Sequence, residues 1–241
     1  MNLSRILVLA LVSVSFSLYA QQPPENGFFE RKLGSYTEKG FYKNGQKNGS
    51  WIKVSREGII SEVETYNEGF KEGVCLTFDR VGTLTKQEFY IHGKLDGWVI
   101  EYYSANKPKT KASYKDGLLW GKYTMYYENG RMMEESNYKN GVKSGTSKWF
   151  DENAKMVAQY NYKDGLFDGI NRTFYPSGNI EAEKNYSNNI LEGAYVEYYP
   201  TGKKKITGNY KAGEKDGEWI EFDPTGKVIK TTKYTAGKIE K

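Results

Sequence analysis

The chain of 241 residues contains one cysteine, Cys75, and one histidine, His92. A single cysteine cannot close an internal disulfide, so other interactions must hold the fold together. With neither a second histidine nor a cysteine cluster, the spacing offers no zinc site, and a histidine-based catalytic triad could draw only on His92. His92 stands directly before Gly93, which indicates a turn residue. Cys75 lies in the column that holds Trp51, Tyr123, Tyr195 and Trp219, which favours a packed side chain over a reactive thiol. These shortages argue against an enzyme and predict no metal and no cofactor.

Aliphatic side chains are also scarce. Only 38% of the residues are hydrophobic, yet 15% are aromatic, and there are 21 Tyr and 26 Gly. This composition does not suit a conventional large core, and it is too aromatic for a disordered chain. Abundant Tyr and Gly together predict many short strands joined by tight turns.

The sequence has no strong excess of charge. Its 35 basic and 30 acidic residues leave a formal charge of +5, and no basic stripe is present that would follow a phosphate backbone. The lysines at 203–205 form only a local cluster. We therefore expect no nucleic-acid partner, and a membrane lipid is disfavoured.

Residues 1–20 differ from the rest of the chain. Arg5 precedes an apolar run from Ile6 to Leu18, and the segment ends in Ala20. This pattern predicts a secretory signal peptide cleaved after Ala20; the alternative, an uncleaved membrane anchor, has a run shorter than the roughly 20 residues that span a bilayer. The sequence thus predicts export to the periplasm, the envelope or the outside of the cell.

One tyrosine recurs every 24 residues without insertion or deletion: Tyr42, Tyr66, Tyr90, Tyr114, Tyr138, Tyr162, Tyr186, Tyr210 and Tyr234. Counted from each of these repeat tyrosines as position 0, glycine dominates positions 3, 7 and 16, and these columns contain 22 of the 26 glycines. We interpret positions 3 and 7 as turn glycines, as in Gly45, Gly49, Gly141, Gly145, Gly165, Gly169, Gly213 and Gly217. Such a fixed period indicates a repeat architecture.

Each repeat holds two turns and two strands. Pairs such as Asn140-Gly141 favour a type I′ hairpin turn, and segments such as 175–178, with sequence YPSG, favour a second, longer turn. Positions 10 and 12 are apolar around a polar residue, and position 18 is mostly aliphatic, which is the alternation of half-buried strands. The sequence therefore predicts an all-β fold, an elongated antiparallel sheet of tandem hairpins with seventeen or so strands. We expect a leader and N-terminal cap hairpin over 21–41 and eight repeats over 42–241.

Two recurring features are candidates for function. The first feature is a set of doublets of adjacent aromatic residues in the strands. Because neighbouring strand residues face opposite sides of the sheet, we expect the second ring of a doublet to point away from the repeat tyrosines. The candidate binding aromatics are Tyr103, Tyr127, Trp149 and Tyr199, with ordinary strand packing as the alternative. Acidic residues recur at position 6, but one carboxylate per repeat is too few for calcium, and turn chemistry explains them more simply.

The unit Y-K-x-G-x-x-[DE]-G-x-[WY]-x-x-[YF]-[YD]-x-x-G-x-[ILM] resembles the MORN repeat, specifically the bacterial variant found in YwqK-type antitoxins. The resemblance covers residues 26 to 240. It implies successive β-hairpins in one elongated, twisted sheet and a binding or scaffolding role, since MORN arrays are associated with protein partners and also with membrane lipids. An antitoxin role would require an exported or contact-delivered toxin, because the signal peptide directs this chain out of the cytoplasm.

Taken together, the sequence favours an exported, non-enzymatic scaffold or adaptor that binds a protein, antitoxin-like toward an exported toxin in its narrowest form. The alternative is an array that binds carbohydrate or cell wall. The aromatic, glycine-rich repeats suit a glycan, but Gly-Trp occurs only at Gly97-Trp98. The oligomeric state is not determined by the sequence.

Overall fold

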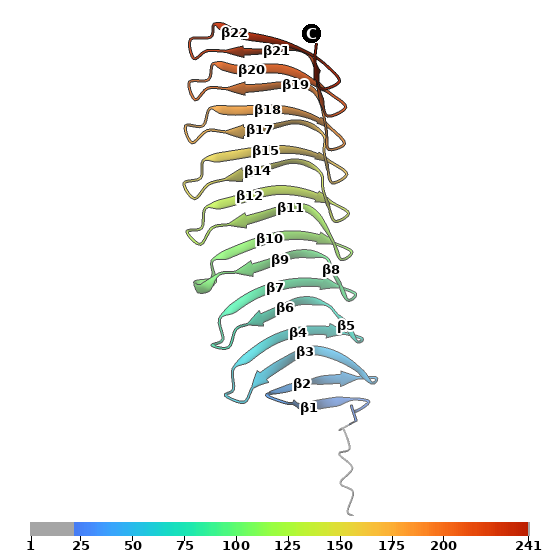
Figure 1. Ribbon diagram of the computed structural model, residues 1–241. Helices are drawn as coiled ribbons and strands as arrows, with labels where there is room; N and C mark the ends of the chain where they lie inside the picture. The colour runs from blue at the N-terminus through green and yellow to red at the C-terminus, as the bar shows by residue number, and fades with distance from the viewer. Residues whose placement is uncertain (1–21, 241) are drawn as a thin grey trace, which may run out of the picture.

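A computed structural model describes residues 22–240, and the signal peptide predicted for 1–20 lies outside this range. The described chain forms one antiparallel sheet in which each strand pairs with its neighbours in sequence, so that the repeats are stacked in order from β1 to β23 (Figure 1). The strands are β1 (Gly27–Leu33), β2 (Tyr36–Lys43), β3 (Gln46–Ser55), β4 (Ile60–Asn67), β5 (Phe70–Lys71), β6 (Gly73–Phe78), β7 (Leu84–Ile91), β8 (Lys94–Leu95), β9 (Gly97–Tyr102), β10 (Pro108–Lys115), β11 (Leu118–Tyr126), β12 (Met132–Lys139), β13 (Val142–Lys143), β14 (Gly145–Phe150), β15 (Met156–Lys163), β16 (Leu166–Phe167), β17 (Gly169–Phe174), β18 (Ile180–Ser187), β19 (Ile190–Tyr198), β20 (Lys204–Lys211), β21 (Glu214–Phe222), β22 (Val228–Thr235) and β23 (Lys238–Ile239).

Each 24-residue unit is a β-hairpin, as the sequence predicts. The tight turn has positive φ at both central residues, for example 51° at Asn140 and 83° at Gly141, which is the requirement of a type I′ turn. The longer turn closes with a glycine of positive φ at position 16, such as Gly178 at 92°. Where position 16 is Asn106, the turn becomes the 3₁₀ segment η1 (Ser104–Asn106), the one helical element of the described residues.

The glycine at position 7 is not a turn residue, which corrects the prediction for Gly49, Gly145, Gly169 and Gly217. All four lie within or at the start of a strand with φ between 71° and 98°. Around this position the pairing register shifts, so the first strand of the hairpin bulges against its predecessor and is split into two parts in several units. Glycine is needed there because a side chain would disfavour the positive φ of the bulge.

The register also decides which residues share a face. Gly145 pairs with Tyr162, and Ser147 pairs with Tyr160, so positions 7, 9 and 11 of the first strand lie on the same face as the repeat tyrosines. We call this the ladder face. Positions 10 and 12 lie on the opposite face, and position 13 returns to the ladder side. The prediction that the second ring of each aromatic doublet points away from the repeat tyrosines is therefore wrong.

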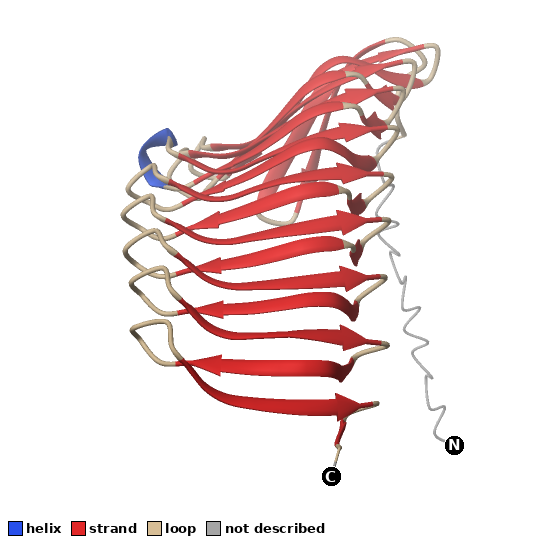
Figure 2. Cartoon of the chain, turned by 90° about the horizontal axis from the view of Figure 1, so that it is seen from above, coloured by secondary structure: helices blue, strands red, loops and turns tan. Residues whose placement is uncertain are grey.

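The sheet is a single twisted layer (Figure 2), and most of its buried residues belong to the ladder face. Repeat tyrosines there alternate with rings at position 9: Trp219 lies 5.1 Å from Tyr210 and 6.2 Å from Tyr234, measured between ring centroids. Trp51 makes the same contacts near the other end of the array, 5.1 Å from Tyr42 and 6.4 Å from Tyr66. The core is thus a row of side chains on one face of a sheet that has no second layer.

The ring at position 9 on this face packs against the residue at position 22 of the preceding unit. A Cβ added to Gly208, at position 22, would lie 2.3 Å from the Trp219 ring, and one added to Gly40 would lie 2.4 Å from the Trp51 ring. These are two of the few glycines outside the repeat columns. Where the ring is the smaller Tyr123, the matching residue is Ala112, and the two are paired across neighbouring strands. In these three units a small residue at position 22 leaves room for the large ring at the following position 9.

Candidate functional site

Lysines at position 5 lie over the rings of the ladder face. The Nζ of Lys143 is 4.5 Å from the centroid of Trp149 and 5.5 Å from that of Tyr162. The Nζ of Lys215 lies 4.1 Å above Trp219. These cation–π contacts cover the aromatic row with positive charge while leaving it partly exposed, an arrangement that the sequence analysis did not identify, although the lysine column is visible in the sequence.

Buried carboxylates balance several of these lysines. Glu134 accepts hydrogen bonds from Lys143 (2.6 Å) and from Ser136 (2.6 Å). Burial acts to raise the pKa of Glu64, but hydrogen bonds from Lys71 and from the Tyr66 hydroxyl outweigh it and hold the pKa below its ordinary value. The ladder face is therefore a network of rings, ammonium groups and carboxylates rather than an apolar surface.

Burial raises the pKa of tyrosine hydroxyls on the ladder face. It raises the pKa of Tyr138 to about 12, and the nearby Glu134 raises it further. It also raises the pKa of Tyr195, whose hydroxyl donates a hydrogen bond of 2.6 Å to Glu197. Both phenols are therefore neutral at physiological pH, and that of Tyr195 remains the donor to Glu197.

A groove opens on the ladder face between residues 160 and 205. Two hollows of about 130 Å³ and 320 Å³ share Thr173, Ala182 and Lys184. The first is also lined by Tyr160 and Phe167, whose rings lie 5.3 Å apart. Asn171 lines the first hollow at position 9, where four other units carry a large ring (Trp51, Tyr123, Tyr195 and Trp219).

The side chains around the groove come from several strands. Trp149, one of the predicted binding aromatics, packs 5.0 Å from Tyr160 at the edge of this cluster. The second hollow adds carboxylates at Glu181 and Glu197 and a further lysine, Lys205. The groove thus combines aromatic walls, small buried side chains and charges of both signs, which are the elements of a protein-binding surface.

The other predicted binding aromatics have a structural role. The hydroxyl of Tyr103 donates to the carbonyl oxygen of Tyr126 at 3.0 Å, that of Tyr127 to Phe150 at 2.9 Å, and that of Tyr199 to Phe222 at 2.8 Å. Each bond crosses from position 13 of one unit to position 12 of the next. We call these tyrosines, together with Tyr175, the latch tyrosines, because they fasten consecutive units at the long turns.

The acidic residues of position 6 also join units. The carboxylate of Glu72 accepts a hydrogen bond from the backbone N–H of His92 at 2.8 Å, and that of Glu192 accepts one from Ala212 at 2.7 Å. This agrees with the turn interpretation, with the difference that each carboxylate caps the turn of the next unit. Among residues 22–240 no group of His, Cys, Asp or Glu is arranged to hold a metal ion.

The single cysteine and histidine take the places that the sequence predicts. Cys75 is buried at position 9 of the ladder face, and burial raises the pKa of its thiol, which disfavours the reactive thiolate. His92 lies in a tight turn with φ of 47°, its side chain largely exposed and its Nδ1 3.5 Å from Glu72. No helix within the described part of the chain is long and apolar enough to cross a membrane.

Comparison with protein families identifies the repeat. The family model described as "MORN repeat variant" matches residues 121–140, 143–164, 167–188, 191–212 and 215–240. A search of curated proteins finds no match. Residues 42–120 carry the same tyrosine and glycine columns and the same strand pairing, so the structural unit continues beyond the matched segments. Such repeats are consistent with a scaffold or protein-binding role. The groove described above lies within the matched segments, and the MORN repeat variant is thus found in five tandem copies over residues 121–240.

Proposed function

We propose that this protein is an exported, non-enzymatic scaffold that binds a partner protein in the groove of its ladder face. The observation that carries the proposal is the pair of adjoining hollows around Thr173, Ala182 and Lys184. An open single layer leaves these side chains accessible, and repeat arrays commonly use such extended surfaces for recognition.

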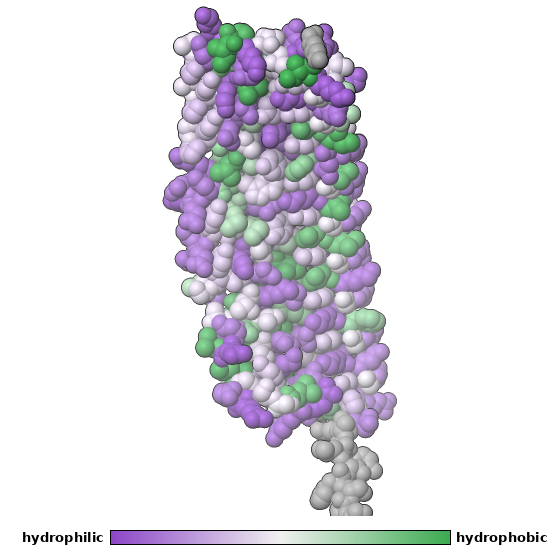
Figure 3. Space-filling model, in the orientation of Figure 1, coloured by the Kyte–Doolittle hydropathy of each residue, from purple (hydrophilic) through white to green (hydrophobic). Residues whose placement is uncertain are grey.

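The chemistry of the groove suits a peptide surface of mixed character. Tyr160, Phe167 and Tyr186 offer large apolar faces, and aromatic side chains of this kind are frequent binding anchors. Lys184 lies at the junction of both hollows and provides a positive charge for a partner carboxylate. Figure 3 shows apolar patches distributed among hydrophilic side chains along the array, which is typical of a surface that recognises a folded or extended protein.

The proposed location is the periplasm, the envelope or the extracellular space, on the basis of the signal-peptide pattern in residues 1–20. The narrower form of the proposal is an antitoxin-like role toward an exported toxin. It rests on the resemblance of the repeat columns to YwqK-type antitoxins, and it would make the groove the surface that covers the toxin.

A glycan is the second candidate, favoured by one observation. Trp98 and Trp120 are 41% and 38% exposed, and indole rings are good platforms for sugars. Lysines lie near both rings, however, with Lys111 Nζ 4.4 Å from the Trp98 centroid. The protein partner is therefore the preferred proposal.

The test is affinity capture with tagged residues 21–241, crosslinked in intact cell envelopes and analysed for proteins and glycans. Lys184→Glu reverses the charge at the junction of the two hollows, and Lys163→Glu makes the same change at an exposed hairpin end. We expect one dominant protein that is retained by Lys163→Glu and lost with Lys184→Glu. Capture of glycan without protein would replace the proposal by the second candidate, and a partner retained equally by both variants would exclude the groove.

A further inference from the structure

The long turns are fastened by a repeated contact that half of the eight units lack: Asp151 and Asp223 stand at position 13 in two of them, and two successive units near the N-terminus lack it as well. In four units a latch tyrosine at position 13 donates its hydroxyl to the carbonyl oxygen at position 12 of the next unit, at 3.0, 2.9, 2.7 and 2.8 Å. In the units that begin at Tyr42 and Tyr66, position 13 is Ser55 and Asp79.

These two side chains bind their own turns instead. Ser55 Oγ accepts the backbone N–H groups of Glu57 (3.2 Å) and Ile59 (3.3 Å). Asp79 Oδ1 accepts those of Val81 (2.9 Å) and Thr83 (2.8 Å). Neither side chain fills the space that the ring of a latch tyrosine takes. For a tyrosine in place of Ser55, the acceptor at position 12 of the next unit would be the carbonyl oxygen of Phe78.

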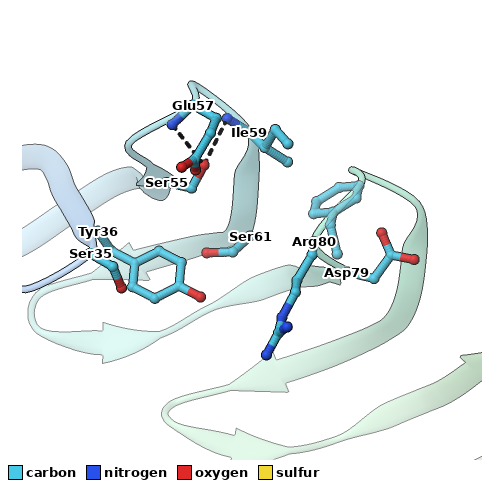
Figure 4. A pocket seen from close by; sticks show the side chains of 9 residues that line it. Ser35, Tyr36, Ser55, Glu57, Ile59, Ser61, Asp79 and Arg80 are labelled. Carbon is cyan, nitrogen blue, oxygen red and sulfur yellow. Dashed lines mark hydrogen bonds between the residues drawn. The ribbon is translucent and has the colours of Figure 1, made fainter.

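A hollow of about 500 Å³ occupies this place. It is lined by Ser35, Tyr36, Ser55, Ile59, Ser61 and Phe78, with Glu57, Asp79 and Arg80 around it (Figure 4). The first hairpin contributes to the opening, because its turn at Gly34 and Ser35 is too short to extend beside the turn of the next unit. In Figure 4 the ring of Tyr36 points toward Ser61, while Arg80 extends from the following turn.

We propose that this hollow binds a tyrosine side chain of a partner protein. The ring takes the place that a latch tyrosine takes in the other units, against Tyr36, Ile59 and Phe78, and its hydroxyl donates to the carbonyl oxygen of Phe78. The volume lies in the range of ordinary ligand pockets and admits a ring with its neighbouring backbone. Arg80 at the rim offers a site for a carboxylate of the same partner segment.

The inference rests on the proposed protein-binding function, but it concerns a different part of the array. The groove of the ladder face lies around Thr173 and Ala182, whereas this hollow belongs to the turns after β3 and β6. A partner whose capture depends on Lys184 but not on Ser55 would remove the present inference and leave the proposed function intact.

The experiment is an NMR titration of ¹⁵N-labelled residues 21–241 with p-cresol, the side-chain analogue of tyrosine, and with N-acetyl-tyrosinamide. We expect saturable shifts of backbone amides confined to the lining residues, and much smaller shifts with toluene, which has the ring but no hydroxyl. Ser55→Tyr lets the chain fill its own hollow, so it should abolish the shifts and raise the melting temperature. Ser55→Ala is the matched control: it removes the turn cap without adding a ring, so the cresol shifts should remain.

A reverse variant keeps the test decisive if Ser55→Tyr does not fold. Tyr127→Ser removes a latch directly before a unit whose position 13 is Asp151, so it should create a second set of cresol-dependent shifts near Phe150. Absence of saturable shifts, shifts equal with toluene, or saturation by methyl glucoside in place of cresol would each overturn the assignment.

Discussion

The matched volumes on the ladder face give the sharpest prediction. Gly208→Ala places a methyl group 2.3 to 2.7 Å from three atoms of the Trp219 ring. The backbone of Gly208 is not in the left-handed region, so the substitution adds a steric clash without backbone strain. Trp219 is 5% exposed and its Nε1 donates to the Asn209 carbonyl at 3.1 Å, so the ring cannot move freely.

Overpacking of this kind costs about 1–3 kcal/mol of stability, and losing the indole hydrogen bond adds about 1 kcal/mol, so we expect Gly208→Ala to destabilise by roughly 3 kcal/mol. Trp219→Tyr alone should cost about 2 kcal/mol through lost burial and the lost bond. The double variant recreates the Ala112–Tyr123 pair that the chain already contains. It should therefore be more stable than the sum of the two single changes by about 1–2 kcal/mol.

Urea denaturation followed by circular dichroism measures all four proteins of this cycle. Gly202→Ala is a useful control, since no atom lies within 4 Å of its added Cβ and its cost comes only from a φ of 84°. Gly40→Ala should repeat the effect against Trp51 at the other end of the array. A cost for Gly208→Ala below about 0.5 kcal/mol, or strictly additive effects in the double variant, would refute the volume argument.

Three further predictions follow from other parts of the array. Ser147→Ala should leave stability unchanged or raise it by about 1 kcal/mol in urea denaturation, because Ser147 Oγ is buried without a hydrogen-bond partner within the described residues; a clear loss would show that the hydroxyl is satisfied. The contribution of Tyr138 to stability should be constant below about pH 10, where unfolded tyrosine is still protonated, and should be lost as the pH rises toward about 12, because burial raises the folded pKa of Tyr138 to about 12. Parallel loss of β-sheet circular dichroism and gain of phenolate absorbance above about pH 10 would show this, whereas ionisation of all phenols at about pH 10 without unfolding would contradict it. Deleting residues 114–137 removes one complete unit and keeps the register, so the shorter chain should fold with a β-sheet spectrum, whereas collapse to an unfolded chain would mean that non-neighbouring units depend on one another.

Local chemistry in the sequence determined the repeating hairpin. Asn140 and Gly141 adopt positive φ because few other residue types do so at low cost, and the same reason applies at each tight turn. The fixed interval of 24 residues between tyrosines then makes one open sheet the consequence of repeating that hairpin. These features depend on contacts within a unit, and so they were predictable from the order of residues.

Contacts between units decided the rest. The bulge at position 7 and the pairing of Gly145 with Tyr162 set which face each side chain takes, and the alternation of polar and apolar residues alone placed Tyr103 and Tyr127 on the wrong side. The sequence shows a glycine at 208 and a large ring at Trp219, but it does not show that positions 22 and 9 are neighbours across strands. Only the structure therefore reveals that these two residues are complementary in size. The groove at Asn171 and the hollow beside Ser55 lie where position 9 or position 13 carries a small side chain in place of a large ring, and only the stacked structure shows the space that this leaves between units.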